Sequence, residues 1–237
     1  MKIDYKNLKG EVFKFSYDTK RFYFKKLFEE HFQKIKIKNI EKIHIECPRN
    51  LLPNEIVGVM NDQSYGLYEY MYKIDNGYSP NKERSNFLKL YDSFISYIKE
   101  FHFDNNSIIY QSKPTLRIHL QGNKAVGGFH RDREYNHPID EINFWLPITK
   151  SKNTSTIWIE DGLNTNKYKS WDINYGEYII FDSGLMHGNK VNTENLTRVS
   201  FDFRIIEKNL WNNKQKNNTS ILQKIKFDIG EYYHYME

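Results

Sequence analysis

The chain has 237 residues, a length that favours one compact core with appendages over two full domains. Its formal net charge is +5, and aromatic residues make up 16% of it, which argues against disorder. Residues 1–40 contain 11 basic and 5 acidic side chains, so the basic surplus is a property of this N-terminal segment. The basic residues follow no nucleic-acid-binding motif, and we therefore expect no nucleic acid partner.

The single cysteine favours a reducing compartment, and the hydropathy favours a protein without membrane segments. Cys47 is the only cysteine, which excludes an intrachain disulfide and a structural zinc site built on several thiolates. The mean hydropathy is −0.77, and no apolar leader or long uncharged apolar stretch occurs. We expect a cytoplasmic protein with no membrane partner.

Helices are expected in the first part of the chain. Between Thr19 and Ile37, apolar and aromatic residues recur mostly at steps of three and four, which predicts an amphipathic helix. A second long helix is predicted over residues 81–101, after a turn at 76–80. Between them, Ile43-His44-Ile45 alternates with charge, which predicts a short strand.

After Asn106 the pattern changes to short alternating runs between polar turns, which predicts a β domain. The predicted strands are 107–112, 114–121, 126–131, 139–149, 155–160, 177–182 and 196–206. From Arg198 to Ile205, polar and apolar residues alternate, so one face of that strand is a candidate site. From Glu207 onward the chain is polar, which fits a tail, a lid or the arm of a homodimer.

Two histidines and one carboxylate in this β region match a metal-binding pattern. His130 and Asp132 are two residues apart and share a face if the segment is extended. His187 lies 57 residues later, and two histidines with one carboxylate match the facial triad of non-haem Fe(II) oxygenases. The His-x-Asp pattern alone is weak evidence in a chain with 8 His and 30 acidic residues, where a simple histidine–carboxylate hydrogen bond is the plainer interpretation.

Arg198 and Ser200 strengthen the metal interpretation. Arg198 follows His187 by 11 residues, and Ser200 lies on the same face of the predicted strand. The planar, permanently charged fork of arginine suits a carboxylate, and a neighbouring hydroxyl completes the contact. A dicarboxylate co-substrate would fit this pair.

In order and spacing these residues resemble the Fe(II)/2-oxoglutarate-dependent dioxygenases, whose pattern is His-x-Asp, a distal His and then Arg-x-Ser. The chain is most similar to the StrG-like group of streptomycin biosynthesis, over roughly residues 107–206. The segments that carry this resemblance are Pro114–His119, Phe129–Asp132, Glu141–Pro147, His187–Asn189 and Thr197–Arg204.

The resemblance implies a mainly β fold with helices. Residues 107–206 would form a double-stranded β-helix, a jelly-roll or cupin-like core. Residues 1–106 would support it as a mixed helical part, and residues 207–237 would be a C-terminal extension of the same single domain, 1–237.

The resemblance also implies a set of site residues. His130, Asp132 and His187 would bind iron, and Arg198 with Ser200 would hold the far carboxylate of 2-oxoglutarate. The family consumes 2-oxoglutarate and O2, usually hydroxylates its substrate, and releases succinate and CO2. Halogenating members have a small residue in place of the carboxylate ligand, so Asp132 favours hydroxylation or a related oxidation.

Further residues are candidates for contacts with co-substrate or substrate. Arg117 and His119 lie two apart on a predicted strand and would both face the barrel interior, although a strand-face ion pair is an equal alternative. Asn143 and Trp145 share a face of the next strand; Asn143 could hydrogen-bond 2-oxoglutarate, whereas core packing is the alternative for Trp145. His137 is a loop histidine that could contact substrate.

These inferences predict an iron(II)- and 2-oxoglutarate-dependent dioxygenase acting on a small polar, carbohydrate-like molecule such as a sugar, an aminocyclitol or a glycan precursor. One alternative is a non-enzymatic, cupin-like module that binds a metal for structure or for sugar recognition. Another keeps the chemistry but hydroxylates a protein or peptide. A nucleic-acid demethylase ranks last, because the sequence shows no base-flipping pocket or basic rim.

Overall fold

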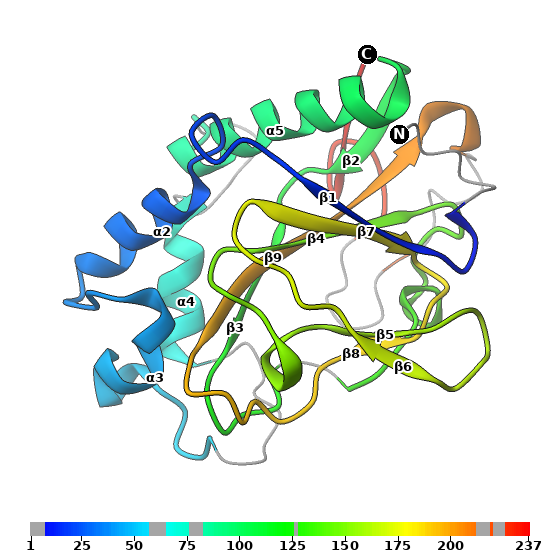
Figure 1. Cartoon of the computed structure of the whole chain (residues 1–237). Helices are drawn as coiled ribbons and strands as arrows, with labels where there is room; N and C mark the ends of the chain where they lie inside the picture. The colour runs from blue at the N-terminus through cyan, green and yellow to red at the C-terminus, as the bar shows by residue number, and fades with distance from the viewer. Residues whose placement is uncertain (1–7, 57–64, 76–82, 126–127, 212–218, 220–225) are drawn as a thin grey trace.

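The computed structural model describes residues 8–56, 65–75, 83–125, 128–211, 219 and 226–237 (Figure 1). Two antiparallel sheets carry the fold, one with seven strands and one with three. The large sheet contains β1 (Val12–Ser16), β2 (Ile108–Gln111), β3 (Thr115–His119), β4 (Ile142–Pro147), β7 (Glu177–Asp182), β9 (Arg198–Glu207) and β10 (Tyr233–Met236). The small sheet contains β5 (Trp158–Glu160), β6 (Tyr168–Ser170) and β8 (His187–Gly188).

The helices lie in the first part of the chain. They are α2 (Phe24–Gln33), α3 (Ile43–Glu46), α4 (Gly66–Tyr72) and α5 (Asn86–Phe103). Short 3-10 helices occur at Ile40–Lys42, Arg49–Leu51, Lys73–Asp75, Asp132–Tyr135, Asn153–Ser155 and Lys208–Leu210. None of the helices in the described ranges is both long and apolar enough to cross a membrane.

The chain passes back and forth between the two sheets. After β3 in the large sheet, His130 forms an isolated bridge with His187 of β8 in the small sheet. The chain returns to the large sheet as β4, forms β5 and β6 in the small sheet, and returns again as β7. β8 and β9 repeat the alternation, which gives the large sheet the core order β3-β9-β4-β7. This is the topology of a double-stranded β-helix, and the predicted mainly β fold with a jelly-roll core is confirmed.

Strand periodicity separates an outer apolar face of the large sheet from an inner face. In β9, every second residue belongs to the main hydrophobic core: Val199, Phe201, Phe203 and Ile205. The intervening residues are polar, and β4 follows the same rule with Asn143 and Trp145 on the inner face. The structure buries both faces of β9, because the second sheet covers the polar one.

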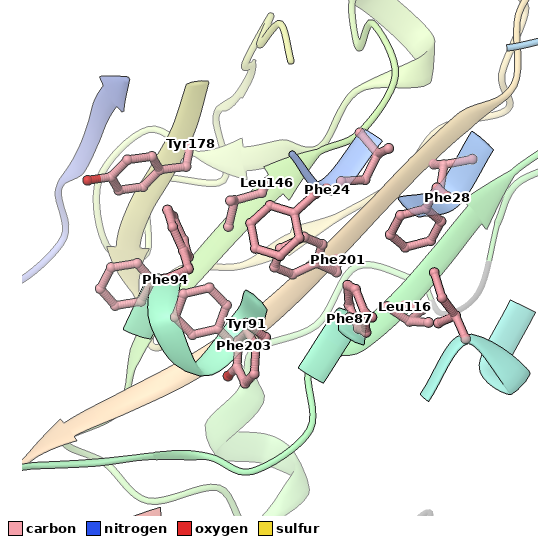
Figure 2. Close-up of a cluster of buried hydrophobic side chains, with 14 of the residues drawn as sticks. Phe24, Phe28, Phe87, Tyr91, Phe94, Leu116, Leu146, Tyr178, Phe201 and Phe203 are labelled. Atoms are coloured by element: carbon pink, nitrogen blue, oxygen red, sulfur yellow. The ribbon is translucent and has the colours of Figure 1, made fainter. Parts of the chain in front are cut away.

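The outer face is covered by helices α2, α4 and α5, which lie on the side of the large sheet away from β5, β6 and β8 (Figure 1). Figure 2 shows rings of α2 and α5 packed on rings of β9, with Phe24, Phe94 and Phe203 among them. Phe24 and Phe201 meet edge to face with their centroids 5.0 Å apart. This aromatic layer fixes the sheet whose other face carries the polar residues.

The helix α4 closes the free edge of β3. The hydroxyl of Tyr68 accepts from the amide of Ile118 at 3.1 Å and donates to its carbonyl at 3.3 Å. Tyr72 makes the same pair of contacts with Leu116, at 3.2 and 3.4 Å. Because an uncovered edge strand leaves backbone groups unpaired, these two tyrosines hold β3 in place beside β9.

Two predictions for the first part of the chain need correction. The helix predicted over Thr19–Ile37 is shorter, Phe24–Gln33, because the Asp18 side chain accepts from the Lys20 amide and forms a turn before it. The residues predicted as a strand, Ile43-His44-Ile45, begin helix α3 instead; Ile43 is fully buried and Ile45 is 67% exposed, whereas a strand would place both on one face.

Strand β1 was not predicted. β1 pairs with β7 across more than 160 residues, and a five-residue strand carries no local sign of so distant a partner. The second long helix is confirmed as α5, capped by Ser85, whose hydroxyl accepts from the Leu88 amide. The predicted turn at 76–80 lies outside the described residues.

The predicted strands after Asn106 match β2, β3, β4, β5, β7 and β9, with ends that differ by a few residues. The strand expected at 126–131 is reduced to the single bridge at His130, and residues 126–127 lie outside the described part. Strands β6, β8 and β10 were not predicted. The last of them shows that the described end of the chain is part of the fold, since β10 pairs with β2 and Phe227 is 1% exposed.

Candidate metal and co-substrate site

Three predicted ligand residues meet inside the barrel. His130, Asp132 and His187 each offer one ligand atom, and these atoms all lie within 4.8 Å of one another. Asp132 Oδ1 lies 3.4 Å from His130 Nε2 and 3.6 Å from His187 Nε2. The donor set is two imidazole nitrogens and one carboxylate oxygen, which leaves coordination positions open on a first-row metal.

The imidazoles are oriented by backbone carbonyls. His130 Nδ1 donates to the carbonyl of Gly128 at 2.9 Å, and His187 Nδ1 donates to the carbonyl of Leu185 at 3.0 Å. Because a carbonyl can only accept, each neutral ring has its proton on Nδ1 and its lone pair on Nε2. The two lone pairs therefore lie on the side of Asp132, the orientation that a metal-binding histidine requires.

The pKa shifts favour metal binding at His187 and Asp132, whereas at His130 a metal ion would have to compete with a proton. Burial lowers the pKa of His187 to about 4, which keeps that ring neutral at physiological pH. Burial also opposes the charged form of His130, but its hydrogen bond to Asp132 raises the pKa above the usual histidine value. For Asp132, burial is outweighed by the charge of Arg204 and by the histidines, so its pKa lies well below the ordinary range.

The ligand segment is clamped from its outer side. Arg131 and Arg133 alternate in the sequence with His130 and Asp132, and their side chains point away from the ligand cluster. Arg131 donates to the buried Glu160 at 2.9 Å, and Arg133 donates to Asp182 at 2.8 Å. Gly184 leaves space for this clamp, because a Cβ there would lie 2.5 Å from the Arg133 guanidinium. The two ion pairs tie the ligand residues to β5 and β7.

A cavity of about 40 Å³ joins the two histidines of the ligand cluster to Arg198. It is lined by two of the three ligand residues together with residues of β3, β4, β7 and β9 and of the segment that follows β8: Arg117, His130, Asn143, Trp145, Ile157, Phe181, His187, Gly188, Asn189, Arg198, Asp202 and Arg204. The histidines and the Arg198 guanidinium therefore line one common cavity.

Arg198 is 1% exposed and lacks a full set of partners. Its Nη1 donates to the carbonyl of Ser155 at 3.1 Å and to Asn189 Oδ1 at 2.7 Å, both uncharged acceptors. Its Nε and the hydroxyl of Ser200 are buried without a hydrogen-bond partner among the described residues. Burial lowers the pKa of Arg198 to about 10, so a bound anion would stabilise the charged form. An unpaired buried guanidinium donor fits a carboxylate ligand. Ser200 lies two residues further along β9 and is not among the residues that line the cavity.

The structure places the other predicted residues in different surroundings. Asn143 donates to Asp132 Oδ2 at 2.9 Å, and its own Oδ1 is buried without a partner in the described part. Trp145 lines the cavity with its ring centroid 5.6 Å from the Arg198 guanidinium, and it also belongs to the apolar cluster between the sheets.

Arg117 and His119 differ from each other. Arg117 Nε donates to Asp202 Oδ1 at 3.1 Å, which is the strand-face ion pair, and the side chain also lines the cavity. His119 is fully buried, and its Nε2 donates to the carbonyl of Asn123 at 2.8 Å. His119 is not among the residues that line the cavity.

His137 also has a partner of its own. Its Nδ1 lies 2.8 Å from the fully buried Glu141, whose other oxygen accepts from the hydroxyl of Tyr233 in β10. The ring of Phe227 packs against the His137 ring at a tilt of 46°, with centroids 4.2 Å apart. This network links the C-terminal strand to the segment after the ligands.

Sequence reasoning missed three polar residues of the cavity: Asn189, Asp202 and Arg204. The alternation of β9 places Asp202 and Arg204 on the same face as Arg198, and that signal could have found them. Asn189 follows strand β8 directly in an irregular segment, and no periodicity connects it with Arg198.

Comparison with known proteins supports the resemblance over part of the chain. No family model matches it. The streptomycin biosynthesis protein StrG of Streptomyces griseus is 35% identical over 129 residues, which are 54% of this chain and 60% of that protein. The predicted similarity to the StrG-like group is confirmed, and the match spans less than two thirds of the relative.

Several solved structures are similar at low identity. The nickel complex of the non-heme monooxygenase ThoJ has a TM-score of 0.47 and 10% identity, covering 86% of this chain and 77% of that one. AviO1 from Streptomyces viridochromogenes has a TM-score of 0.46 and 11% identity, covering 85% and 91%. The alpha-ketoglutarate-dependent carbocyclase SnoK has a TM-score of 0.46 and 9% identity, covering 86% and 82%. These identities carry no information about the substrate.

Proposed function

We propose that the chain is an iron(II)- and 2-oxoglutarate-dependent dioxygenase that hydroxylates or otherwise oxidises a small polar molecule such as a sugar, an aminocyclitol or a glycan precursor. Succinate and CO2 would be the co-products. The observation that carries this proposal is one cavity lined both by the two histidines of the histidine–carboxylate cluster and by the buried, under-partnered Arg198. The similarity to StrG supports the choice of a small biosynthetic substrate.

The residues present fit both groups. His130, Asp132 and His187 would hold the iron, since their donor atoms converge and the imidazole protons are bound elsewhere. Arg198 and Ser200 would hold one carboxylate of 2-oxoglutarate with the donors that lack partners in the described part of the chain. Bound iron(II) and 2-oxoglutarate together supply the activation of dioxygen.

The remaining polar residues would orient these groups. Asn143 holds Asp132 through its amide nitrogen and offers its free oxygen to a bound ligand. Trp145 flanks the guanidinium of Arg198 and excludes water from it, which strengthens a charge-assisted hydrogen bond. Arg117 would contact co-substrate or substrate at the cavity wall while Asp202 holds its Nε. For the fully buried His119 we propose an indirect contribution, through the Asn123 loop, to the same co-substrate pocket.

Iron-dependent formation of succinate from 2-oxoglutarate tests this function. The wild-type protein should release succinate under air with Fe(II), and Asp132→Ala should abolish the release while the protein stays folded. Asp75→Ala is the matched control, because Asp75 is a buried carboxylate paired with Lys113 away from the cavity. Equal succinate formation by the wild type and Asp132→Ala would refute the proposal. Metal binding without any succinate would favour a non-enzymatic binding module.

A further inference from the structure

We infer that Arg204 is a positioning residue for the metal ligand Asp132, and that Asp202 holds Arg204 in place. The inference rests on the metal site proposed above. It concerns how the carboxylate is presented, which the ligand triad alone does not specify.

The two oxygens of Asp132 have different surroundings. Oδ2 accepts from Arg204 Nε at 3.3 Å, from Arg204 Nη2 at 3.2 Å and from Asn143 Nδ2 at 2.9 Å. Oδ1 is the oxygen that lies 3.4 and 3.6 Å from the two histidine Nε2 atoms. With three donors on Oδ2, rotation of the carboxylate would break several hydrogen bonds at once in a buried site. Asp132 therefore presents Oδ1 to the metal position.

Arg204 is itself held rigidly. Its Nη1 donates to Asp202 Oδ2 at 2.6 Å and to Gln111 Oε1 at 3.3 Å, and its side chain is 8% exposed. The contacts come from β9 and from the neighbouring strand β2. The guanidinium fork thus has a fixed plane, which a lysine at this position could not reproduce.

Charge and positioning make opposite predictions for the loss of Arg204. A guanidinium close to a divalent cation repels it, so removal of the charge alone would strengthen metal binding. Removal of the positioning contacts would weaken it, because the carboxylate gains freedom that metal binding must then restrict. The sign of the change therefore identifies the role.

Arg117 provides the matched control for charge. It pairs with the other oxygen of the same partner, Asp202 Oδ1 at 3.1 Å, and it lines the same cavity. The described structure shows no hydrogen bond between Arg117 and Asp132. Arg117→Gln therefore removes one positive charge from the same network and leaves the contacts of the ligand intact.

The experiment measures the affinity of the metal-free protein for Co(II) by anaerobic titration without 2-oxoglutarate, together with the visible spectrum of the Co(II) form. Arg204→Gln should weaken Co(II) binding by about 10–100-fold and change the spectrum. Arg204→Lys keeps the charge but loses the fork and should give an intermediate affinity. Arg117→Gln should bind Co(II) at least as tightly as the wild type.

Several results would overturn the inference. They are an unchanged or higher affinity in Arg204→Gln, full wild-type affinity in Arg204→Lys, or an equal loss in Arg117→Gln. If Arg204→Gln does not fold, as thermal unfolding will show, Arg204→Lys carries the test through its affinity and spectrum. If the wild type binds no divalent metal, the proposed function fails as well, and this outcome is distinguishable from loss of the Arg204 effect alone.

Discussion

The two faces of strand β9 divide the molecule into a region that holds the fold together and a region that is equipped for chemistry. On the outer face, Phe201 and Phe203 pack under α2 and α5 in a layer of aromatic rings. On the inner face, Arg198, Asp202 and Arg204 line a cavity and are charged; the two arginines are buried and Asp202 is partly buried. Adjacent residues of one strand therefore have different physical roles.

The outer and inner faces differ in how much they stabilise the fold. Burial of an aromatic side chain in a packed core contributes several kcal/mol, whereas a buried ion pair roughly offsets the cost of removing its charges from water. The series of ion pairs that runs from Arg117 through Asp202 and Arg204 to Asp132 therefore adds little to the stability of the fold. Its value lies in fixing the geometry of a binding site.

The largest expected effect is the loss of metal binding in the inner cavity, with the outer aromatic layer left intact. His187→Gln should remove measurable Fe(II) binding, because one of the three proposed ligands is lost. Isothermal titration with Fe(II) under anaerobic conditions measures the binding. The midpoint of thermal unfolding of the metal-free protein should stay close to the wild-type value, and a large drop would contradict the separation of the two faces.

The second effect is a loss of stability caused by a substitution on the outer face, with the metal site left intact. Phe203→Ala should lower the free energy of unfolding by about 3–5 kcal/mol, because a fully buried ring stacked on Phe144 is replaced by a void. Urea unfolding measures the loss. Fe(II) affinity of the folded fraction should be unchanged, and a fall comparable to that of His187→Gln would show that the two faces are coupled.

The third effect separates co-substrate from metal within the inner face. Arg198→Gln should weaken 2-oxoglutarate binding by about 10–100-fold, the value of one or two charge-assisted hydrogen bonds, and leave Fe(II) affinity near wild type. Competition between 2-oxoglutarate and its close analogue N-oxalylglycine reports the affinity. An unaltered affinity for 2-oxoglutarate would remove Arg198 from the co-substrate site.

The smallest effect concerns pH and the inner ion pairs. Burial raises the pKa of Asp202, but Arg117 and Arg204 outweigh it and the pKa is lowered in the folded state. Such a carboxyl group stabilises the fold at pH values above its pKa in the unfolded chain, which is about 3.9. This contribution is lost as the pH falls through its pKa in the folded state. The difference in unfolding free energy between the wild type and Asp202→Asn should therefore shrink between about pH 5 and pH 3. A difference that stays constant over this range would contradict the assignment, and Phe203→Ala, which removes no charge, is the pH-independent control.

Local pattern was sufficient for the strands that form the barrel core. Period-two alternation in β9 and the apolar run of β7 predicted both strands, because one or both faces of each strand are packed against the core. The same alternation misled at Ile43-His44-Ile45, where three residues fit a helix as well as a strand and the Glu46 carboxylate, which accepts from the amide of Lys38, favours the helix.

Contacts between distant segments were beyond local pattern. β1 and β10 are short strands whose partners lie more than 100 residues away, so no periodicity identified them. The candidate ligands came from residue type and spacing, but the convergence of His187 on Asp132 depends on the bridge between His130 and His187. Likewise, alternation places Arg204 on the inner face, but its contact with Asp132 comes from the pairing of β9 with β4.

Anaerobic addition of Fe(II) and 2-oxoglutarate to the metal-free protein tests the central claim most directly. The account predicts a metal-to-ligand charge-transfer band in the visible range that requires both additions, disappears in His187→Gln and needs more 2-oxoglutarate in Arg198→Gln. Absence of the band in the wild type, or an equal band in His187→Gln, would contradict the claim that one cavity binds iron and 2-oxoglutarate together.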